Sequence, residues 1–257
     1  MQHLDLFSGI GGFTIAAKLN GINTVGFSEI DPFACTVLAK HFPEIPNYGD
    51  IKEMSGELFR DFIGVDLITG GFPCTDLSQA AHGSHKHLDG EHSGLFWELA
   101  RLINEIDPEW VVIENVPQVV KHMETVKQEM FAYEWSHRIF DSQNFGCACR
   151  RKRAYIVGHP EPGRADAVLN YAEKRGQVIR SRGAEDVLPM LLPWKGGVSL
   201  ERLSSCLVEI TETNAGGIRE SDGIPGRLDG RRYLALGNSI TPVIPFWIFA
   251  GMESVVC

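Results

Sequence analysis

The chain has 257 residues, 44% of them hydrophobic and 22% charged; this is typical of one large globular domain, or one with a small appendage, and excludes collagen-like, coiled-coil and disordered chains. The net charge is −9, but residues 145–232 carry 15 Lys and Arg against 11 Asp and Glu. A basic stretch on an acidic scaffold fits a surface that faces phosphates, and it equally fits a solvated surface.

Strands and helices alternate over the first 115 residues. Short apolar runs, each ended by glycine, proline or an acidic residue, predict buried strands at 4–7, 24–27, 65–69 and 111–114. Apolar residues at helical spacing predict helices at 12–19, 32–41 and 95–106, and Asp31 and Pro32 suit the start of the second one. This alternation predicts a doubly wound α/β fold with a parallel sheet covered on both faces.

The composition and periodicity of the sequence change after a further strand predicted at 154–157. Beyond it, Gly and Pro are frequent and strong periodicity fades until residue 233. The final segment is apolar, with Pro242 and Pro245 near the start of a predicted helix that returns to the core. We therefore expect a core domain made of 1–158 and 233–257 and a small irregular region at 159–232.

Nothing in the sequence indicates export or membrane insertion. The longest strongly apolar stretch, 243–252, contains Pro245 and is too short to cross a bilayer, and the N-terminus lacks the features of a signal peptide. We expect a cytoplasmic protein whose six cysteines are reduced. Cys147 and Cys149 have no second ligand pair at zinc-finger spacing, so no metal site is expected.

A glycine-rich turn follows the first predicted strand. Residues 5–12 read Asp-Leu-Phe-Ser-Gly-Ile-Gly-Gly, and such a turn before a helix lets a ligand approach the backbone. Glu29 closes the second strand, where a nucleoside cofactor needs an acceptor for its ribose, and Asp50 follows the next segment. The pattern predicts a nucleoside-cofactor site. The alternative is the turn of any doubly wound fold, with both acids acting as helix caps.

A cysteine stands just beyond the strand at 65–69. Residues 70–78 read Gly-Gly-Phe-Pro-Cys-Thr-Asp-Leu-Ser, which places the Cys74 thiol at the edge of a parallel sheet where ligands bind. The polar segment 79–94, rich in His and Gly, has the composition of a mobile lid. Cys74 is therefore a candidate nucleophile, and the alternative is a small buried hydrophobic residue.

A carboxylate ends the next strand at the same edge. In a partly desolvated site, Glu114 can hold a proton near neutral pH or hydrogen-bond a protonated ring nitrogen. The alternative is that Glu114 caps a helix starting at Pro117.

Four basic residues precede the strand at 154–157. Because side chains alternate along a strand, Arg151 and Arg153 would share one face, and Arg150 and Lys152 the other. One face would serve the site while the other meets phosphate.

Taken in order, these residues resemble the motifs of the DNA cytosine-C5 methyltransferase family. Residues 5–12 resemble its cofactor loop, with Glu29 and Asp50 as its ribose-binding and adenine-contacting acids. The other matching segments are the Pro-Cys loop at 71–74, the Glu-Asn-Val motif at 114–116, the Arg-x-Arg motif after 144–146 and the closing Gly-Asn-Ser motif at 237–242. The resemblance implies the Rossmann-like fold of methyltransferases that use S-adenosylmethionine (AdoMet), with 159–232 as a small target-recognition region.

The resemblance also implies an activity, DNA (cytosine-5-)-methyltransferase. A methyl group would pass from AdoMet to C5 of a flipped-out cytosine in duplex DNA, through a covalent bond between Cys74 and C6 of the base. Glu114 would hydrogen-bond N3 and the exocyclic amine, Arg153 would contact O2, and Arg151 would orient the site or bind phosphate. The residues expected to bind the cofactor are Phe7, Gly9, Gly11, Glu29, Ile30, Asp50, Phe72, Leu95, Asn238 and Ile240.

The sequence departs from the family pattern in two places. Cys147-Ala148-Cys149 replaces the usual Val-Pro-Gln, although both arginines stay in register. The region at 159–232 is short, and 227–230 only echoes the usual Arg-Leu-x-Gly-Phe signature. Such a region suggests a short target or help from a partner. Compact members of this restriction-modification family are often orphan or phage-encoded, so we expect a monomeric bacterial or phage enzyme without a companion nuclease.

Three other interpretations remain open at this point. One branch of the family methylates tRNA with the same motifs. A catalytically silent binding protein would keep the fold and the cofactor site, but the presence of Cys74, Glu114 and Arg153 counts against it. A dinucleotide dehydrogenase ranks last because no residue supplies a hydride-transfer site.

Overall fold

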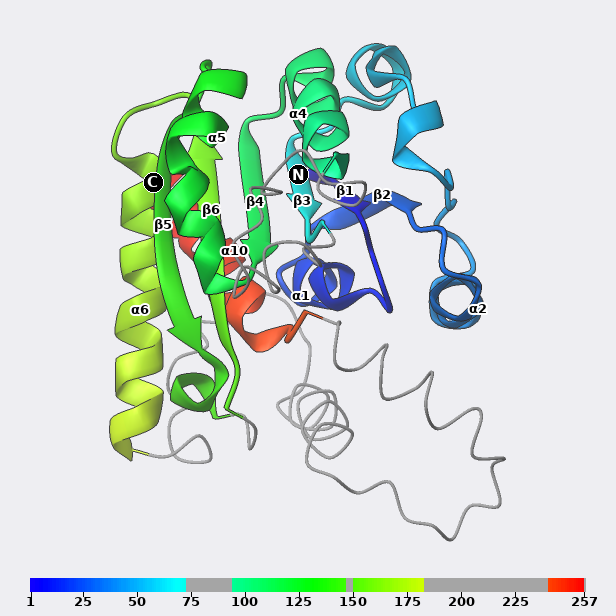
Figure 1. Ribbon diagram of the computed structural model, residues 1–257. Coiled ribbons are helices and arrows are strands. Elements are labelled where there is room, and N and C mark those ends of the chain that lie inside the picture. Colours follow the sequence, from blue (N-terminus) through cyan, green and yellow to red (C-terminus); the bar gives the residue numbers. More distant parts are fainter. Residues whose placement is uncertain (73–93, 147–149, 183–239, 257) are drawn as a thin grey trace, which may run out of the picture.

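The computed structural model describes residues 1–72, 94–146, 150–182 and 240–256 (Figure 1). Its centre is a six-stranded sheet with the strand order β2-β1-β3-β4-β6-β5. The strands are β1 (Gln2–Leu6), β2 (Asn23–Ser28), β3 (Leu67–Gly70), β4 (Trp110–Asn115), β5 (Glu134–Asp141) and β6 (Lys152–His159). The four strands predicted before residue 116 correspond to β1 to β4, with bounds that differ by at most two residues.

The sheet is parallel on one side and antiparallel on the other. β2, β1, β3 and β4 pair in parallel, as predicted. β6 instead runs antiparallel between β4 and β5, so the expectation of a wholly parallel sheet is wrong at this end. The connection explains the difference, because only residues 142–151 separate β5 from β6, and parallel neighbours need a longer crossover.

The helices expected from periodicity are present with the predicted bounds. The longer helices are α1 (Gly12–Leu19), α2 (Pro32–His41), α4 (Leu95–Ile106), α5 (Met123–Glu129), α6 (Arg164–Arg182) and α10 (Val243–Val256), and the short turns are η1 (Ile51–Glu53), η2 (Leu58–Ile63), η4 (Pro117–His122) and η5 (Ser142–Phe145). Asp31 caps α2 by accepting hydrogen bonds from the amides of Phe33 and Ala34. Within the described ranges, no helix combines the length and the apolar character needed to span a membrane.

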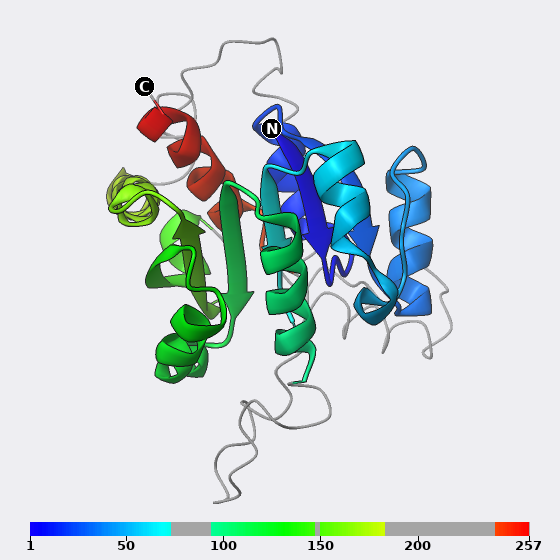
Figure 2. The same cartoon turned by 90° about the horizontal axis from the view of Figure 1, so that it is seen from above.

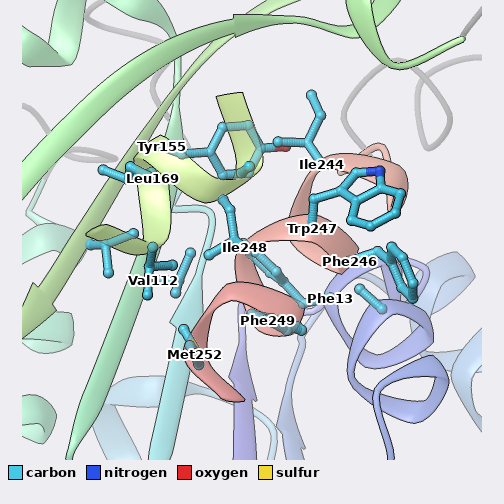
Figure 3. Close-up of a cluster of buried hydrophobic side chains, with 14 of the residues drawn as sticks. Phe13, Val112, Tyr155, Leu169, Ile244, Phe246, Trp247, Ile248, Phe249 and Met252 are labelled. Atoms are coloured by element: carbon cyan, nitrogen blue, oxygen red, sulfur yellow. The ribbon is translucent and has the colours of Figure 1, made fainter. Parts of the chain in front are cut away.

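Helices cover both faces of the sheet. On one face α1, α6 and α10 pack around a cluster of buried side chains that includes Phe13, Val112 and Trp247 (Figure 3). The second cluster lies under α4 and α5 and includes Val111 and Ile113, the neighbours of Val112 in β4. Figure 2 shows α4 and α10 on opposite sides of the sheet. Successive residues of β4 thus point to opposite clusters, as expected for a strand buried on both faces.

The C-terminal helix returns to the core, as predicted. α10 lies against α6 and α1, and it approaches α6 so closely that a Cβ atom at Gly251 would lie 3.2 Å from the carbonyl oxygen of Val168. The prediction of an irregular region from residue 159 onward is wrong for residues 164–182, which form α6 and bury one face of that helix. The assignment of 159–232 to target recognition stays a prediction, and 183–232 lies outside the described residues.

Candidate functional site

The loop between β1 and α1 has an unusual backbone. Phe7, Gly9 and Gly11 all adopt positive φ, with angles of 54°, 54° and 88°. Such an angle is strained for a residue with a side chain, and strain of this kind clusters at binding sites. Among the described residues, a Cβ atom at Gly9 would meet no atom within 4 Å, whereas one at Gly11 would lie 2.9 Å from the Phe42 ring. The loop therefore leaves open space beside Gly9 while Gly11 packs against α2 and the residue that follows it.

Glu29 ties this loop to the end of β2. Its Oε2 accepts a hydrogen bond from the amide of Gly9 at 2.7 Å, and its Oε1 accepts from the amides of Ile30 at 2.9 Å and Asp31 at 2.7 Å. The cap of α2 is Asp31, so the alternative in which Glu29 caps that helix is not what the structure shows. The adjacent Ile30 side chain is 67% exposed, which is high for a large apolar residue.

Asp50 lies in a segment that is hydrogen-bonded to β2. The hydroxyl of Ser28 donates to the carbonyl of Gly49 at 2.8 Å, and the amide of Tyr48 donates to the carbonyl of Phe27 at 2.8 Å. The Asp50 carboxylate accepts from the amide of Lys52 at 3.0 Å and so caps η1. The helix-cap interpretation therefore holds for Asp50, which follows the residue bonded to Ser28 at the end of β2.

Three other predicted cofactor residues come from different elements. The Phe72 ring is buried and lies 5.7 Å from the Phe96 ring, and Leu95 begins α4 half-buried. Ile240 lies between two loops, because a Cβ atom at Gly12 would collide with its carbonyl oxygen and one at Gly71 would lie 3.2 Å from its Cδ1. The segment before α10 thus contacts both the loop after β1 and the loop after β3. Asn238 lies outside the described residues.

A buried ion pair ends β4. The Oε1 atom of Glu114 lies 2.9 Å from Nε of Arg153 on β6, and the side chains are 8% and 24% exposed. Burial raises the pKa of Glu114, although the positive charges of Arg153 and Arg151 oppose the rise. A Cβ atom at Gly71 would lie 3.5 Å from Oε2 of Glu114, so the loop after β3 adjoins the carboxylate. The structure brings Glu114, Arg151 and Arg153 together, and Cys74 lies outside the described residues.

The basic stretch alternates as predicted. Arg151 exchanges hydrogen bonds with Ser142 of η5, since its amide donates to the hydroxyl and its carbonyl accepts from the Ser142 amide, both at 3.0 Å. Arg150 is 70% exposed and pairs with Asp141 at 3.2 Å. The charges of Arg151 and Arg153 lower the pKa of Glu114, whereas Arg150 pairs with Asp141. The residues 147–149, where the family pattern is broken, lie outside the described residues.

Asn115 has a role that the sequence did not indicate. Its amide nitrogen donates to the carbonyl of Phe72 at 3.3 Å, and its Oδ1 accepts from the amide of Val116 at 2.8 Å. Asn115 thereby connects the end of β4 to the backbone just before Pro73. The signal available in the sequence was its place beside Glu114 in the Glu-Asn-Val segment.

A metal site has no basis in the part of the chain that the structure describes. No group of three or more His, Cys, Asp or Glu side chains there is arranged to hold an ion.

Comparisons with known proteins agree with this architecture. Residues 1–187 match the family model of the C-5 cytosine-specific DNA methylase. Over 169 residues the chain is 37% identical to the Type II methyltransferase M2.BsuMI of Bacillus subtilis (strain 168), covering 61% of this chain and 41% of that one. It is 30% identical over 164 residues to the Type II methyltransferase M.HhaI of Haemophilus parahaemolyticus, covering 60% and 48%.

Solved structures of methyltransferases share the fold. The Dnmt2 methyltransferase of S. pombe superposes with a TM-score of 0.66 at 18% identity, covering 99% of each chain. The Entamoeba histolytica methyltransferase EhMeth gives 0.67 at 16% identity, covering 100% of this chain and 99% of that one. The matched regions span less than half the length of the two curated relatives. The fold is that of Rossmann-like methyltransferases, and the chain belongs to the C-5 cytosine-specific DNA methylase family.

Proposed function

We propose that this chain is a DNA (cytosine-5-)-methyltransferase that moves a methyl group from AdoMet to C5 of cytosine in duplex DNA. The observation that carries the proposal is the buried pair of Glu114 and Arg153 beside the loop that leads to Cys74. A carboxylate with a raised pKa next to a guanidinium offers a donor and an acceptor to the polar edge of a base. The loop after β1 stands at the same end of the parallel strands, where such folds bind ligands.

The residues of the loop after β1 fit a nucleoside cofactor. Glu29 uses three acceptor positions on backbone amides, and a carboxylate has about four, so one remains for a ribose hydroxyl. The exposed Ile30 side chain offers an apolar surface to an adenine ring, and the space at Gly9 admits the rest of the molecule. AdoMet would supply an electrophilic methyl group. The proposed binding set is Phe7, Gly9, Gly11, Glu29, Ile30, Asp50, Phe72, Leu95, Asn238 and Ile240.

The chain's own residues would activate the base. In the proposed mechanism the Cys74 thiolate adds to C6 of cytosine, which makes C5 nucleophilic. Glu114 would hydrogen-bond N3 and the exocyclic amine, and Arg153 would hold both Glu114 and O2 of the base. After methyl transfer, loss of the C5 proton and elimination of the thiolate release the product. The base must leave the duplex first, at a cost of a few kcal/mol that contacts in the site offset.

Other residues would position the site, contact the DNA and select the target sequence. Arg151 would orient the site, and Arg150 and Lys152 would face the DNA backbone. We also propose that the chain acts as a cytoplasmic monomer without a companion nuclease, and that residues within 159–232 select the target sequence.

The test is transfer of labelled methyl from AdoMet to unmethylated duplex DNA, with bulk tRNA in a parallel tube and the Cys74→Ala variant as blank. Label in DNA that is absent with the variant supports the proposal. Label in tRNA alone would move the substrate to RNA, and label in neither would overturn the proposed activity.

A further inference from the structure

Five buried polar side chains form a continuous hydrogen-bonded chain beneath α1. His3 lies at its centre, with Nδ1 2.9 Å from the hydroxyl of Thr24 and Nε2 2.8 Å from the hydroxyl of Thr69. Thr69 donates to Oδ1 of Asp5 at 3.0 Å, and Thr14 donates to Oδ2 of Asp5 at 2.7 Å. All five residues are buried. The chain therefore links β2, β1, β3 and α1 through one carboxylate.

The carboxylate sets the direction of every bond in this chain. Thr69 donates its only hydroxyl hydrogen to Asp5, so its oxygen must accept a hydrogen bond from Nε2–H of His3. Nδ1 of His3 then carries no hydrogen and must accept a hydrogen bond from the Thr24 hydroxyl. Burial lowers the pKa of His3 to about 3, so the ring is neutral and carries the single N–H that this direction needs. An ionised Asp5 thus fixes the ring tautomer and the orientation of the threonine hydroxyls.

Asp5 also holds both ends of the loop that the proposed cofactor would contact. Asp5 lies in β1, and the loop in which Phe7, Gly9 and Gly11 adopt positive φ begins two residues later. Beyond the loop, Asp5 accepts a hydrogen bond from the hydroxyl of Thr14, in the first turn of α1. The α1 N-cap residue is glycine and makes no side-chain cap, so the bond from Thr14 to Asp5 is a side-chain link between the start of α1 and β1.

We propose that the ionised carboxylate of Asp5 is a positioning residue: it clamps β1 to α1, holds the intervening loop in its cofactor-binding shape, and makes the affinity for AdoMet depend on pH. The inference rests on the proposed function, because that function supplies the ligand of the loop. Protonation gives the carboxyl a hydrogen that must be donated to one of the two hydroxyls that now donate to it. Protonation therefore reverses the direction of one of the two hydrogen bonds, from Thr14 or from Thr69, that now hold the carboxylate.

The surroundings of Asp5 place this change near neutral pH. Complete burial raises the pKa of Asp5 to about 7, hydrogen bonds from Thr14 and Thr69 oppose the rise, and the charge of Glu29 adds to it. The neutral His3 on β1 contributes no charge. Glu29, beyond the end of β2, is the charged group that acts on Asp5, and α10 presents the ring of Phe249 to His3, at 6.2 Å.

The Asp5→Asn variant separates positioning from a purely structural role. Its amide oxygen can still accept from Thr14, and its NH₂ group can donate to Thr69, which then turns its hydrogen toward His3. The hydrogen-bonded chain can re-form in the reverse direction, so the fold is retained, but the negative charge at the start of α1 is lost. A residue that only fills the core would leave the pH dependence of ligand binding unchanged.

The experiment measures the dissociation constant of AdoMet by calorimetry at several pH values from about 6 to about 8, on both sides of the Asp5 pKa. The proteins are the wild-type chain, Asp5→Asn, Thr14→Val and a control, Thr24→Val, which changes the far end of the hydrogen-bonded chain. The ammonium group of AdoMet titrates in the same range, but it contributes equally to all four proteins.

Beyond the change that the ammonium group causes in all four proteins, the wild-type chain should bind AdoMet about fivefold more weakly at the lowest pH. Asp5→Asn should bind weakly throughout and show only the common change. Thr14→Val removes a donor from the carboxylate, so the midpoint of its pH profile should move upward, and Thr24→Val should keep the wild-type profile. An Asp5→Asn profile that parallels the wild-type one would overturn the inference alone. No binding by the wild-type chain at any of these pH values would overturn the proposed function and this inference with it.

Discussion

Two regions at the same end of the sheet are built by different means. The loop after β1 is shaped by its backbone, with three positive φ angles and three amides gathered on the Glu29 carboxylate. The end of β4 is shaped by side chains, since Glu114 pairs with Arg153 across two strands in a buried setting. The first region leaves open space and an exposed isoleucine, whereas the second holds opposite charges at 2.9 Å.

This difference suits the two regions to the different tasks proposed for them. A preformed backbone loop suits a ligand that must be held in one pose, because no side chain has to be ordered when it binds. A buried ion pair suits a reaction in which charge develops, because fixed charges act strongly away from water. Substitutions in the loop should therefore change the affinity for the cofactor, and those at Glu114 and its partners should change the rate of methyl transfer.

The largest expected effect comes from Cys74, the proposed nucleophile. Cys74→Ser should lower the rate of methyl transfer at least about a thousandfold, because a serine hydroxyl is a far weaker nucleophile than a thiolate. AdoMet affinity should stay close to that of the wild-type chain. Both quantities are measured on the same preparation, by label transfer and by calorimetry.

The matched control is Cys35→Ser. Its thiol donates to the carbonyl of Glu29 at 3.3 Å, next to the cofactor loop, and a serine can make the same bond. This variant should keep most of the transfer rate. Loss of AdoMet binding in Cys74→Ser would mean that the residue supports the cofactor loop instead of attacking the base.

Glu114→Gln tests the electrostatic character of the second region. The rate at saturating AdoMet should fall about a hundredfold, because the amide keeps the shape of the carboxyl but cannot exchange a proton with N3. Since the pKa of Glu114 is raised, the wild-type rate should decline toward high pH as this proton is lost, and the variant should lack that decline.

A second carboxylate paired with an arginine provides the control. Glu105 pairs with Arg101 at 3.0 Å on α4, so Glu105→Gln also removes a carboxylate from a guanidinium, and Glu98 stays 2.9 Å from Nε of the same arginine. Its transfer rate should stay near that of the wild-type chain. Equal losses in the two variants would show that Glu114 serves the fold alone.

The parallel strands and the cluster of Glu114, Arg151 and Arg153 could be predicted from the sequence, for different reasons. Buried parallel strands read as short apolar runs, and Glu114, Arg151 and Arg153 stand at strand ends in a recognisable order. β5 escaped prediction because it is a partly exposed edge strand without a clean alternation of apolar residues. α6 escaped it because small residues such as Ala165, Ala172 and Gly176 form much of its buried face.

The hydrogen-bonded chain around Asp5 could not be foreseen either. Its members lie up to 66 residues apart, and only the pairing of β1 with β2 and β3 brings them together. Threonine and histidine within apolar runs carry no sequence signal of their own. Asp5 was visible as part of the glycine-rich motif, but its partners were not.

The third prediction concerns the effect of the ionised Asp5 carboxylate on the free energy of unfolding. Because the folded-state pKa of Asp5 is raised to about 7 from a reference near 3.8, this residue lowers the free energy of unfolding as the pH rises through that window. Asp5→Asn removes the loss, so above about pH 7 the variant should be more stable, by on the order of 4 kcal/mol, and the gain should shrink toward about pH 4.

Urea denaturation followed by circular dichroism at several pH values measures this difference. Thr24→Val serves as the uncharged comparison, and its stability relative to the wild-type chain should not change with pH. An Asp5→Asn protein that is less stable at high pH would show that the carboxylate stabilises the fold, contrary to the expected sign.

The smallest expected effect tests whether the exposed apolar side chain beside Glu29 belongs to the first region. Ile30→Ala should weaken AdoMet binding about fivefold, because contact with an apolar ligand surface is lost, while the rate at saturating AdoMet stays unchanged. Phe131 is the control, since it is even more exposed, at 85% compared with 67% for Ile30, and it lies on the connection between α5 and β5. Phe131→Ala should leave both quantities unchanged. A lower rate in Ile30→Ala at saturating AdoMet would show that the loop after β1 influences the chemical step as well as binding, and the division of tasks between the two regions would then fail.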